Sequence, residues 1–236
     1  SLFILSFSSM YMKFYFILIL ILLLGCSKAS TSVTADNGSN TGQQTEEDDL
    51  KVFFGPNPNA HVEMVALINS AKTSINLAMF RITENTDANA LMAAAKRQVK
   101  VRVILDREAT QASTVVQKIA TDLRNAGAEV KESTTGFSIT HEKAMTVDGV
   151  KAIISTINMT TGFKTTRDIG IQTEDRSVVT EFNAVFEADW LNADSGGTTT
   201  PTLTSDKLLW SPNNSTQKLV ALIGESTQTI DLQVEN

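Results

Sequence analysis

From residue 51 to residue 192, short runs of β-branched and apolar residues alternate with stretches whose apolar residues recur at helical spacing. The clearest helical stretch has Met64, Leu67, Ile68 and Ala71 at positions i, i+3, i+4 and i+7. Such a stripe must pack against another element, so the alternation predicts an α/β lobe. Because strands that alternate with helices form crossover connections, we expect a mixed, mostly parallel sheet with helices on both faces. Strands are expected at 51–54, 74–80, 99–105, 129–131 and 169–172, with further helices around 88–95, 115–123 and 178–190.

One pair of strands is predicted by its turn. Residues 143–147 and 150–155 are β runs that flank Asp148 and Gly149. An Asp-Gly pair between two β runs favours a hairpin, because a type I′ turn needs positive φ at both central positions.

Residues 207–236 repeat the opening of the lobe. KLLWSPNNSTQKLVALIGESTQTIDLQVEN at 207–236 matches KVFFGPNPNAHVEMVALINSAKTSINLAMF at 51–80 with a one-residue gap. The Gly-, Thr- and Pro-rich segment 193–206 is typical of a linker, so the first lobe is expected to span 51–192. A strand, a helix and a strand cannot bury a core alone, and the repeat therefore predicts the start of a second, truncated lobe.

The N-terminal residues resemble targeting signals. An unbroken apolar run of eleven residues, 14–24, follows Lys13, and Leu23-Leu24-Gly25-Cys26 resembles the lipobox of bacterial lipoproteins. We expect a signal peptide at 1–25, lipidation of Cys26, and an exported protein anchored on the periplasmic or extracellular face of a membrane. The alternative is an uncleaved membrane helix, although the run is short for a bilayer core of roughly 30 Å. Residues 26–50 hold almost no large apolar side chains, which predicts a disordered tether.

The residues that can carry chemistry gather around the predicted hairpin. His141 and Lys143 stand two positions apart at the start of its first strand, so their side chains are expected on one face. An imidazole beside an ammonium suits a phosphate ester, because lysine neutralises oxygen charge and histidine attacks phosphorus or carries a proton. Thr156 and Asn158 repeat this spacing across the hairpin and offer phosphate-binding donors. Asp168 begins the next strand and is expected to orient the imidazole of His141.

These residues resemble the signature of the phospholipase D superfamily. His141, Lys143 and Asp148 fit its H-x-K-x-x-x-x-D pattern, and Ser-Thr-Ile-Asn at 155–158 stands where the family has Gly-Ser-x-Asn. The threonine keeps the hydroxyl, while a serine replaces the glycine. Asp168 resembles the acidic residue that follows the motif in the family.

The resemblance implies a catalytic set of His141, Lys143 and Asp148. His141 would form a covalent phosphohistidine, Lys143 would hold the phosphate, and Asp148 would mainly tie down the hairpin. No cofactor and no metal ion are implied. The family joins two motif copies, and a second histidine protonates the leaving alcohol. This chain has one copy, and we expect its other histidine, His61, to be a surface or capping residue. The second copy would come from a second lobe, which the repeat favours, or from a second subunit.

Three functions remain open from the sequence. The first is hydrolysis or transfer of phosphatidyl groups, as in cardiolipin synthases, which a membrane-anchored position favours. The second is cleavage of nucleic acid by the same chemistry, and the third is a non-catalytic phosphate-binding lobe. The net charge of −6 gives no electrostatic case for nonspecific nucleic-acid binding, although a basic site can lie within an acidic protein. One cysteine and two histidines argue against a metal cage.

Overall fold

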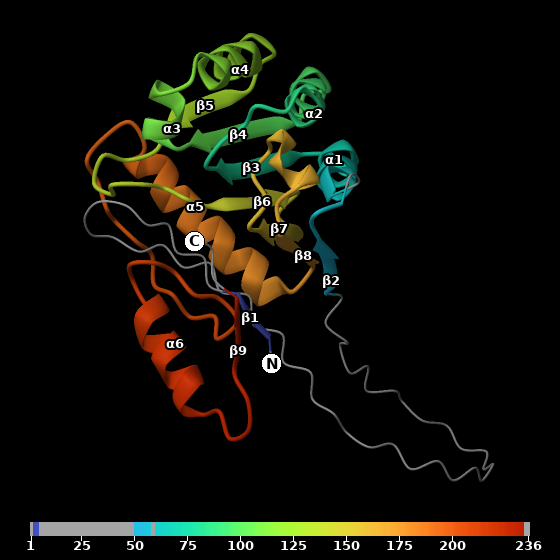
Figure 1. The fold of residues 1–236 in the computed structure, drawn as a ribbon. Helices are drawn as coiled ribbons and strands as arrows, with labels where there is room; N and C mark the ends of the chain where they lie inside the picture. Colours follow the sequence, from blue (N-terminus) through green and yellow to red (C-terminus); the bar gives the residue numbers. More distant parts are fainter. Residues whose placement is uncertain (1, 5–49, 58–59, 234–236) are drawn as a thin grey trace, which may run out of the picture.

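A seven-stranded sheet forms the centre of the computed structural model, which describes residues 2–4, 50–57 and 60–233 (Figure 1). Residues 51–54, 74–79, 100–105 and 129–132 form four of its strands, close to where the apolar pattern predicts them. From edge to edge the sheet consists of β2 (Lys51–Phe54), β8 (Ile169–Thr173), β7 (Lys151–Ser155), β6 (Lys143–Val147), β3 (Ser74–Met79), β4 (Lys100–Leu105) and β5 (Glu129–Glu132).

The expectation of a mostly parallel sheet is wrong. Only the pairs β3–β4 and β4–β5 are parallel, whereas β2–β8, β8–β7, β7–β6 and β6–β3 are antiparallel. The helical crossovers that force parallel pairing connect only β3, β4 and β5. Strands β6, β7 and β8 follow one another without an α-helix between them, and β2 pairs with β8 at the far edge.

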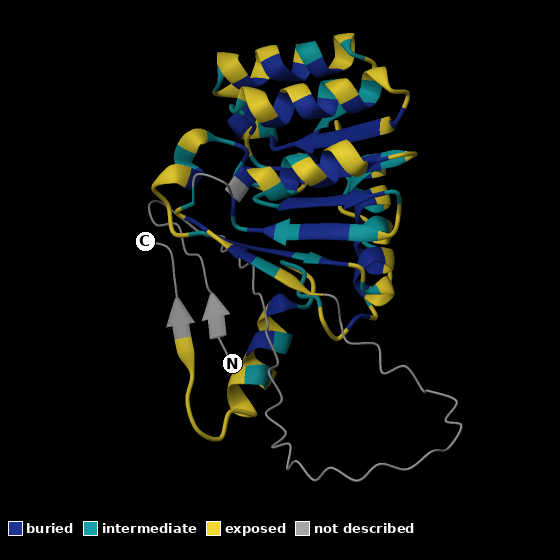
Figure 2. Ribbon diagram, turned by 90° about the vertical axis from the view of Figure 1, so that its right-hand side faces the viewer, coloured by how far each residue is buried: buried dark blue, intermediate teal, exposed yellow. Residues whose placement is uncertain are grey.

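Helices cover both faces of the sheet, as predicted. The helices α1 (Ala60–Ser70), α2 (Asn85–Lys96) and α4 (Thr114–Asn125) pack on one face, and α5 (Arg176–Asn192) crosses the other (Figure 1). Adjacent strand residues alternate between the two layers: Leu77 faces the three helices, and Ala78 faces α5. Figure 2 shows the helices buried toward the sheet and exposed on their outer sides. Two shorter helices, α3 (Arg107–Gln111) and η1 (Thr161–Lys164), lie in connections.

The predicted hairpin joins β6 to β7. Asp148 and Gly149 have φ of 56° and 68°, the signs that a type I′ turn requires, and the N–H of Val150 donates to the carbonyl oxygen of Val147. The prediction of this turn from the Asp-Gly pair is confirmed.

The segment after residue 192 packs along α5. The carboxylate of Glu181 accepts hydrogen bonds from the indole of Trp210 at 2.9 Å and from the N–H of Ser205 at 2.6 Å. Helix α6 (Ser215–Gly224) and strand β9 (Asp231–Gln233) follow in the order of the repeat, but residues 207–210, the counterpart of β2, do not form the expected strand. Strand β9 pairs in parallel with β1 (Leu2–Ile4), apart from the main sheet.

The targeting signals lie almost entirely outside the described residues. This holds for Cys26, for nearly all of the expected signal peptide and for the tether up to residue 49. In the part of the chain that the structure describes, no helix combines the length and the apolar character needed to cross a bilayer.

Candidate active site

His141 and Lys143 lie at one end of the central strands. Lys143 is the first residue of β6 and pairs with Met79, the last residue of β3. His141 was expected on the strand itself and instead stands in the extended segment just before it. The neighbouring strand β7 ends at the same place: its last residue, Ser155, donates its hydroxyl to the carbonyl oxygen of Lys143. The segment that carries Thr156 and Asn158 therefore starts beside β6.

An aromatic ring that the sequence did not point to brings the two groups together. The ring of Phe80, directly after β3, meets the imidazole of His141 edge-to-face, with 4.5 Å between ring centroids. The ammonium of Lys143 lies 5.2 Å from the centroid of the same ring, and it donates a hydrogen bond of 2.7 Å to the carbonyl oxygen of His141. The imidazole and the ammonium thus share one side of the segment, as their spacing predicted.

The surroundings keep the imidazole of His141 neutral. Burial, and second to it the charge of Lys143, lowers the pKa of His141 from 6.5 to about 4. At neutral pH one ring nitrogen therefore carries an unprotonated lone pair, which is the form that attacks phosphorus.

Two carboxyl groups near the motif, those of Glu142 and Asp189, have raised pKa values. Burial, together with the nearby carboxyl of Asp189, raises the pKa of Glu142 to about 8, and the charge of Lys143 opposes this shift. Burial also raises the pKa of Asp189 to about 6. At neutral pH Glu142 is therefore mostly neutral, and its carboxyl does not cancel the charge of Lys143. Neither acid was singled out from the sequence, since their proximity depends on the packing of α5 against β6.

Thr156 and Asp168 bind each other. The hydroxyl of Thr156 donates to the carboxylate of Asp168 at 2.8 Å and accepts from the N–H of Ile169 at 3.0 Å. Thr166 also donates to Asp168. Among the described residues, no hydrogen bond joins Asp168 to His141, so the carboxylate positions Thr156 rather than the imidazole.

Asn158 retains unused hydrogen-bonding capacity. Its Oδ1 is buried and has no hydrogen-bond partner within the described part of the chain. The backbone around Asn158 is held firmly, because the N–H groups of Thr83 and Glu84 donate to the carbonyl oxygen of Met159 at 2.8 and 2.9 Å.

Asp148 lies at the other end of β6 from His141. Five strand residues at roughly 3.3 Å each separate the two ends. The carboxylate of Asp148 accepts hydrogen bonds from the N–H groups of Lys72, Thr73 and Ser74. It therefore ties the hairpin to the start of β3, and the structure leaves it out of the constellation around His141.

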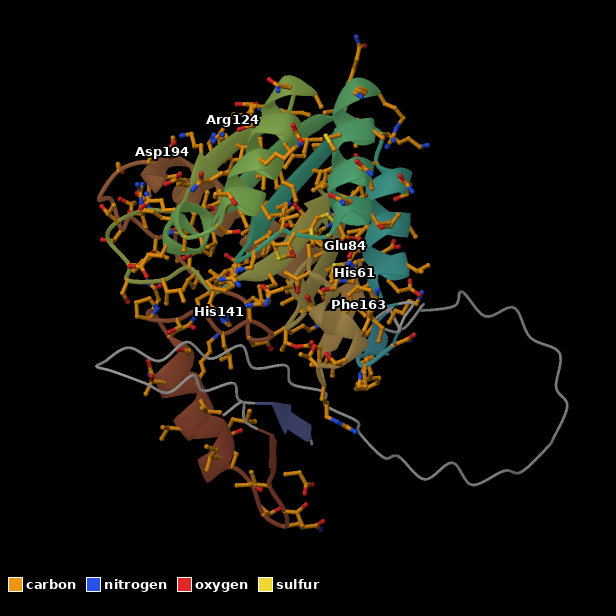
Figure 3. All side chains as sticks on the ribbon, turned by 45° about the horizontal axis from the view of Figure 1, so that its top comes forward. His61, Glu84, Arg124, His141, Phe163 and Asp194 are labelled. Carbon is orange, nitrogen blue, oxygen red and sulfur yellow. The ribbon has the colours of Figure 1, made fainter. Side chains whose placement is uncertain are left out.

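The expectation that His61 lies on the surface is wrong. His61 is 5% exposed, and its Nδ1 contacts Oδ2 of Asp87, which is fully buried. Its ring packs on Phe163 with 3.9 Å between centroids. Burial raises the pKa of Asp87, and the hydrogen bond and charge of His61 oppose this shift. Figure 3 shows His61 beside Phe163 and apart from His141. His61, in the first turn of α1, faces Phe163 of η1 and not solvent, which the helical pattern alone does not reveal.

No group of three or more His, Cys, Asp or Glu side chains suited to a metal ion is present among the described residues.

Comparisons with known proteins find a family profile and relatives similar to this chain. A family profile described as "Cardiolipin synthase, PLD-like domain" matches residues 64–190. Mitochondrial cardiolipin hydrolase from Danio rerio is 30% identical over 126 residues, which cover 53% of this chain and 54% of the relative. The Xenopus tropicalis protein of the same name is 30% identical over 137 residues, 57% of this chain and 63% of the relative. The chain thus spans between half and two thirds of the length of these curated relatives.

Solved structures share the fold. Nuc from Salmonella typhimurium, described as a phospholipase D family member, aligns with a TM-score of 0.59 and 23% identity, covering 62% of this chain and 97% of Nuc. NucT from Helicobacter pylori aligns with a TM-score of 0.58 and 18% identity, over 62% of this chain and 98% of NucT. Polyphosphate kinase from Porphyromonas gingivalis aligns with a TM-score of 0.58 and 21% identity, over 74% of this chain and 30% of the kinase.

Proposed function

This chain belongs to the phospholipase D superfamily, and on that premise we propose that it is a phosphodiesterase that cleaves or transfers the phosphatidyl group of a phospholipid. The observation that carries the proposal is the placement of a neutral imidazole and a buried ammonium against one ring, Phe80. A neutral nucleophile and a fixed cation are the two groups that displacement at a phosphodiester requires.

The reaction has two displacements at phosphorus. In the first, a ring nitrogen of His141 attacks, the bond between phosphorus and nitrogen forms, and the bond to the leaving alcohol breaks. The alcohol takes a proton from a second imidazolium. In the second, water or another alcohol attacks phosphorus and gives its proton to that second imidazole, and the bond to His141 breaks. Lys143 and the side-chain N–H groups of Asn158 donate to the non-bridging oxygens throughout.

The second imidazole is not supplied by His61. That ring is buried and already paired with Asp87. We therefore propose that a second motif completes the site, from a second lobe of the same chain or from the His141 of a second copy. A site shared between two copies predicts that adding chains with His141→Ala lowers activity more than dilution alone would.

A phospholipid is the substrate class that the observations favour. Relatives of 30% identity carry the name cardiolipin hydrolase, and the matching family profile carries the name cardiolipin synthase. The net charge of −6 does not attract a long polyanion such as nucleic acid. The proposed lipidation of Cys26 would hold the enzyme beside a membrane substrate; replacement by serine is expected to abolish labelling of the protein by a radioactive fatty acid.

The test is turnover of phosphatidylcholine and phosphatidylglycerol in mixed micelles, with plasmid DNA as the competing substrate. His141→Ala and Lys143→Ala are each expected to lower turnover by at least about a hundredfold. Lys151→Ala is the matched control, because Lys151 starts the neighbouring strand at the opposite end and pairs with Glu174. An acid-labile phosphoryl label should appear on the protein with His141 and not without it.

The outcomes separate the possible functions. Turnover of DNA alone would replace the lipid assignment with a nuclease. Equal activity in wild type and His141→Ala, or no turnover of any substrate, would remove the catalytic assignment and leave a phosphate-binding lobe.

A further inference from the structure

A second cation lies beside the ring of Phe80. Arg81 follows Phe80 directly and is exposed, and its guanidinium carbon lies 5.4 Å from the centroid of the Phe80 ring. No ion pair or hydrogen bond to this guanidinium is found among the described residues. The assigned chemistry uses His141 and Lys143 and leaves Arg81 without a role.

The ring of Phe80 lies close to the side chains of His141, Lys143 and Arg81. Its centroid is 4.5 Å from that of the His141 imidazole and 5.2 Å from the Lys143 ammonium. The distance from the Arg81 guanidinium carbon to the imidazole centroid therefore cannot exceed the sum of their distances to the Phe80 centroid. Lys143 is 4% exposed, whereas Arg81 is exposed to solvent. The guanidinium of Arg81 is therefore an exposed cation on the same ring that His141 and Lys143 contact.

We propose that Arg81 binds a second phosphate of the substrate, which makes the preferred lipid one with two phosphates joined by a short bridge. This inference rests on the proposed phosphodiesterase function. A glycerol bridge joins two phosphorus atoms through six bonds of about 1.5 Å each, a contour length close to the upper limit on the separation of the imidazole and the guanidinium. Guanidinium binds phosphate in a bidentate manner, and the face of Phe80 restricts where the guanidinium lies.

Other cations in the neighbourhood do not fit this role. Lys164 lies over Phe163, which packs on the buried His61 on the side of the molecule away from His141. Arg102 is 8% exposed and is bound to Glu187 and Asn76 against α5. Arg81 is the exposed cation in contact with the aromatic ring of the site.

The experiment compares cardiolipin, which has two phosphates, with phosphatidylglycerol, which has one, in mixed micelles of the full chain. Phosphatidylglycerol is used at twice the molar amount so that the surface charge is equal. The variants are Arg81→Ala and Arg81→Lys, and Arg176→Ala serves as the control. Arg176 is also exposed, and it is the first residue of α5. It follows β8, whose end lies beside the hairpin end of β7, opposite to the end that carries the site.

We expect Arg81→Ala to raise the KM for cardiolipin roughly tenfold, the loss of one charge-assisted phosphate contact, with little change for phosphatidylglycerol. Arg81→Lys should retain part of the preference, and Arg176→Ala should match wild type. An equal loss on both lipids would place Arg81 on the reacting phosphate or on the surface in general, and no loss would remove its role. Either result overturns the inference.

A binding measurement distinguishes failure of this inference from failure of the proposed function. His141→Ala, with and without Arg81→Ala, is titrated with phosphatidylcholine vesicles that contain cardiolipin or the charge-matched amount of phosphatidylglycerol. A cardiolipin preference that disappears with Arg81→Ala supports the second-phosphate site even if no lipid is hydrolysed. Equal binding to both vesicles, insensitive to Arg81, refutes the site even if the enzyme is active.

Discussion

The protonation of His141 decides whether the proposed attack on phosphorus can occur, and it can be measured directly. Burial, and second to it the charge of Lys143, lowers the pKa of His141 from 6.5 to about 4. This shift corresponds to roughly 3 kcal/mol in favour of the neutral ring, an upper value because the side chain remains partly exposed. We expect the imidazole to stay neutral as the pH falls until it approaches that pKa.

Replacement of Lys143 separates the two causes. Lys143→Met removes the charge and keeps an unbranched apolar side chain in a buried position. Because burial is the larger cause, the pKa of His141 should rise in this variant but stay below 6.5. The measurement is an NMR titration of the histidine Cε1–Hε1 signals. The chain has two histidines, and the spectrum of His141→Gln assigns them.

Stability provides a second measurement with a defined sign. The unfolded His141 binds a proton near pH 6.5, and the folded one only near pH 4. Its contribution to the free energy of unfolding is therefore present above pH 6.5 and is lost as the pH falls toward the folded pKa. Urea unfolding between pH 7.5 and pH 4 should show this loss in wild type and less of it in His141→Gln. An imidazole that titrates at 6.5 or above, or a pKa unmoved by Lys143→Met, would refute the electrostatic reasoning.

Three further perturbations test the framework around the site. Asp148→Ala removes the hydrogen bonds from three backbone N–H groups and places alanine at φ 56°, so urea unfolding should show a loss of about 2 kcal/mol in the free energy of unfolding. Asp148→Asn, which tolerates this backbone conformation, should lose about 1 kcal/mol. A large fall in kcat at unchanged stability would instead place Asp148 in the chemistry. Although burial opposes it, the backbone bonds from Ser74, Thr73 and Lys72 lower the pKa of Asp148, so its contribution to stability is expected above the unfolded pKa and lost as the pH falls below it. His61→Leu leaves the fully buried Asp87 without its partner and should cost about 3 kcal/mol, part of which Asp87→Ala in the same chain recovers; a single-variant loss under about 1 kcal/mol contradicts the buried pair. Phe80→Leu removes the ring that contacts both His141 and Lys143 and is expected to lower kcat about tenfold with KM nearly unchanged, and an unchanged kcat would show that the ring does not orient the imidazole.

The features predicted from the sequence share one property: they depend on neighbours in the chain. The Asp148-Gly149 turn follows from the φ that glycine and aspartate tolerate, and the helices follow from apolar spacing. The common side of His141 and Lys143 follows from the two-residue period of extended backbone. These predictions did not depend on which helices and strands pack against one another.

Other features depend on residues far apart in the chain. Strand direction was wrong because β2 pairs with β8 and β6 pairs with β3, contacts that no local pattern encodes. The Thr156–Asp168 bond likewise joins side chains whose meeting follows from the pairing of β7 with β8.

By itself, the sequence determined the elements, the turn and the motif, because propensity and periodicity act within a few residues. Only the tertiary structure decided that His61 is buried against Asp87, that Phe80 joins the imidazole to the ammonium, and that Asp148 stands apart from them. The physical reason is that burial and side-chain contact depend on the order and direction of strands, which are set by the packing of the whole sheet.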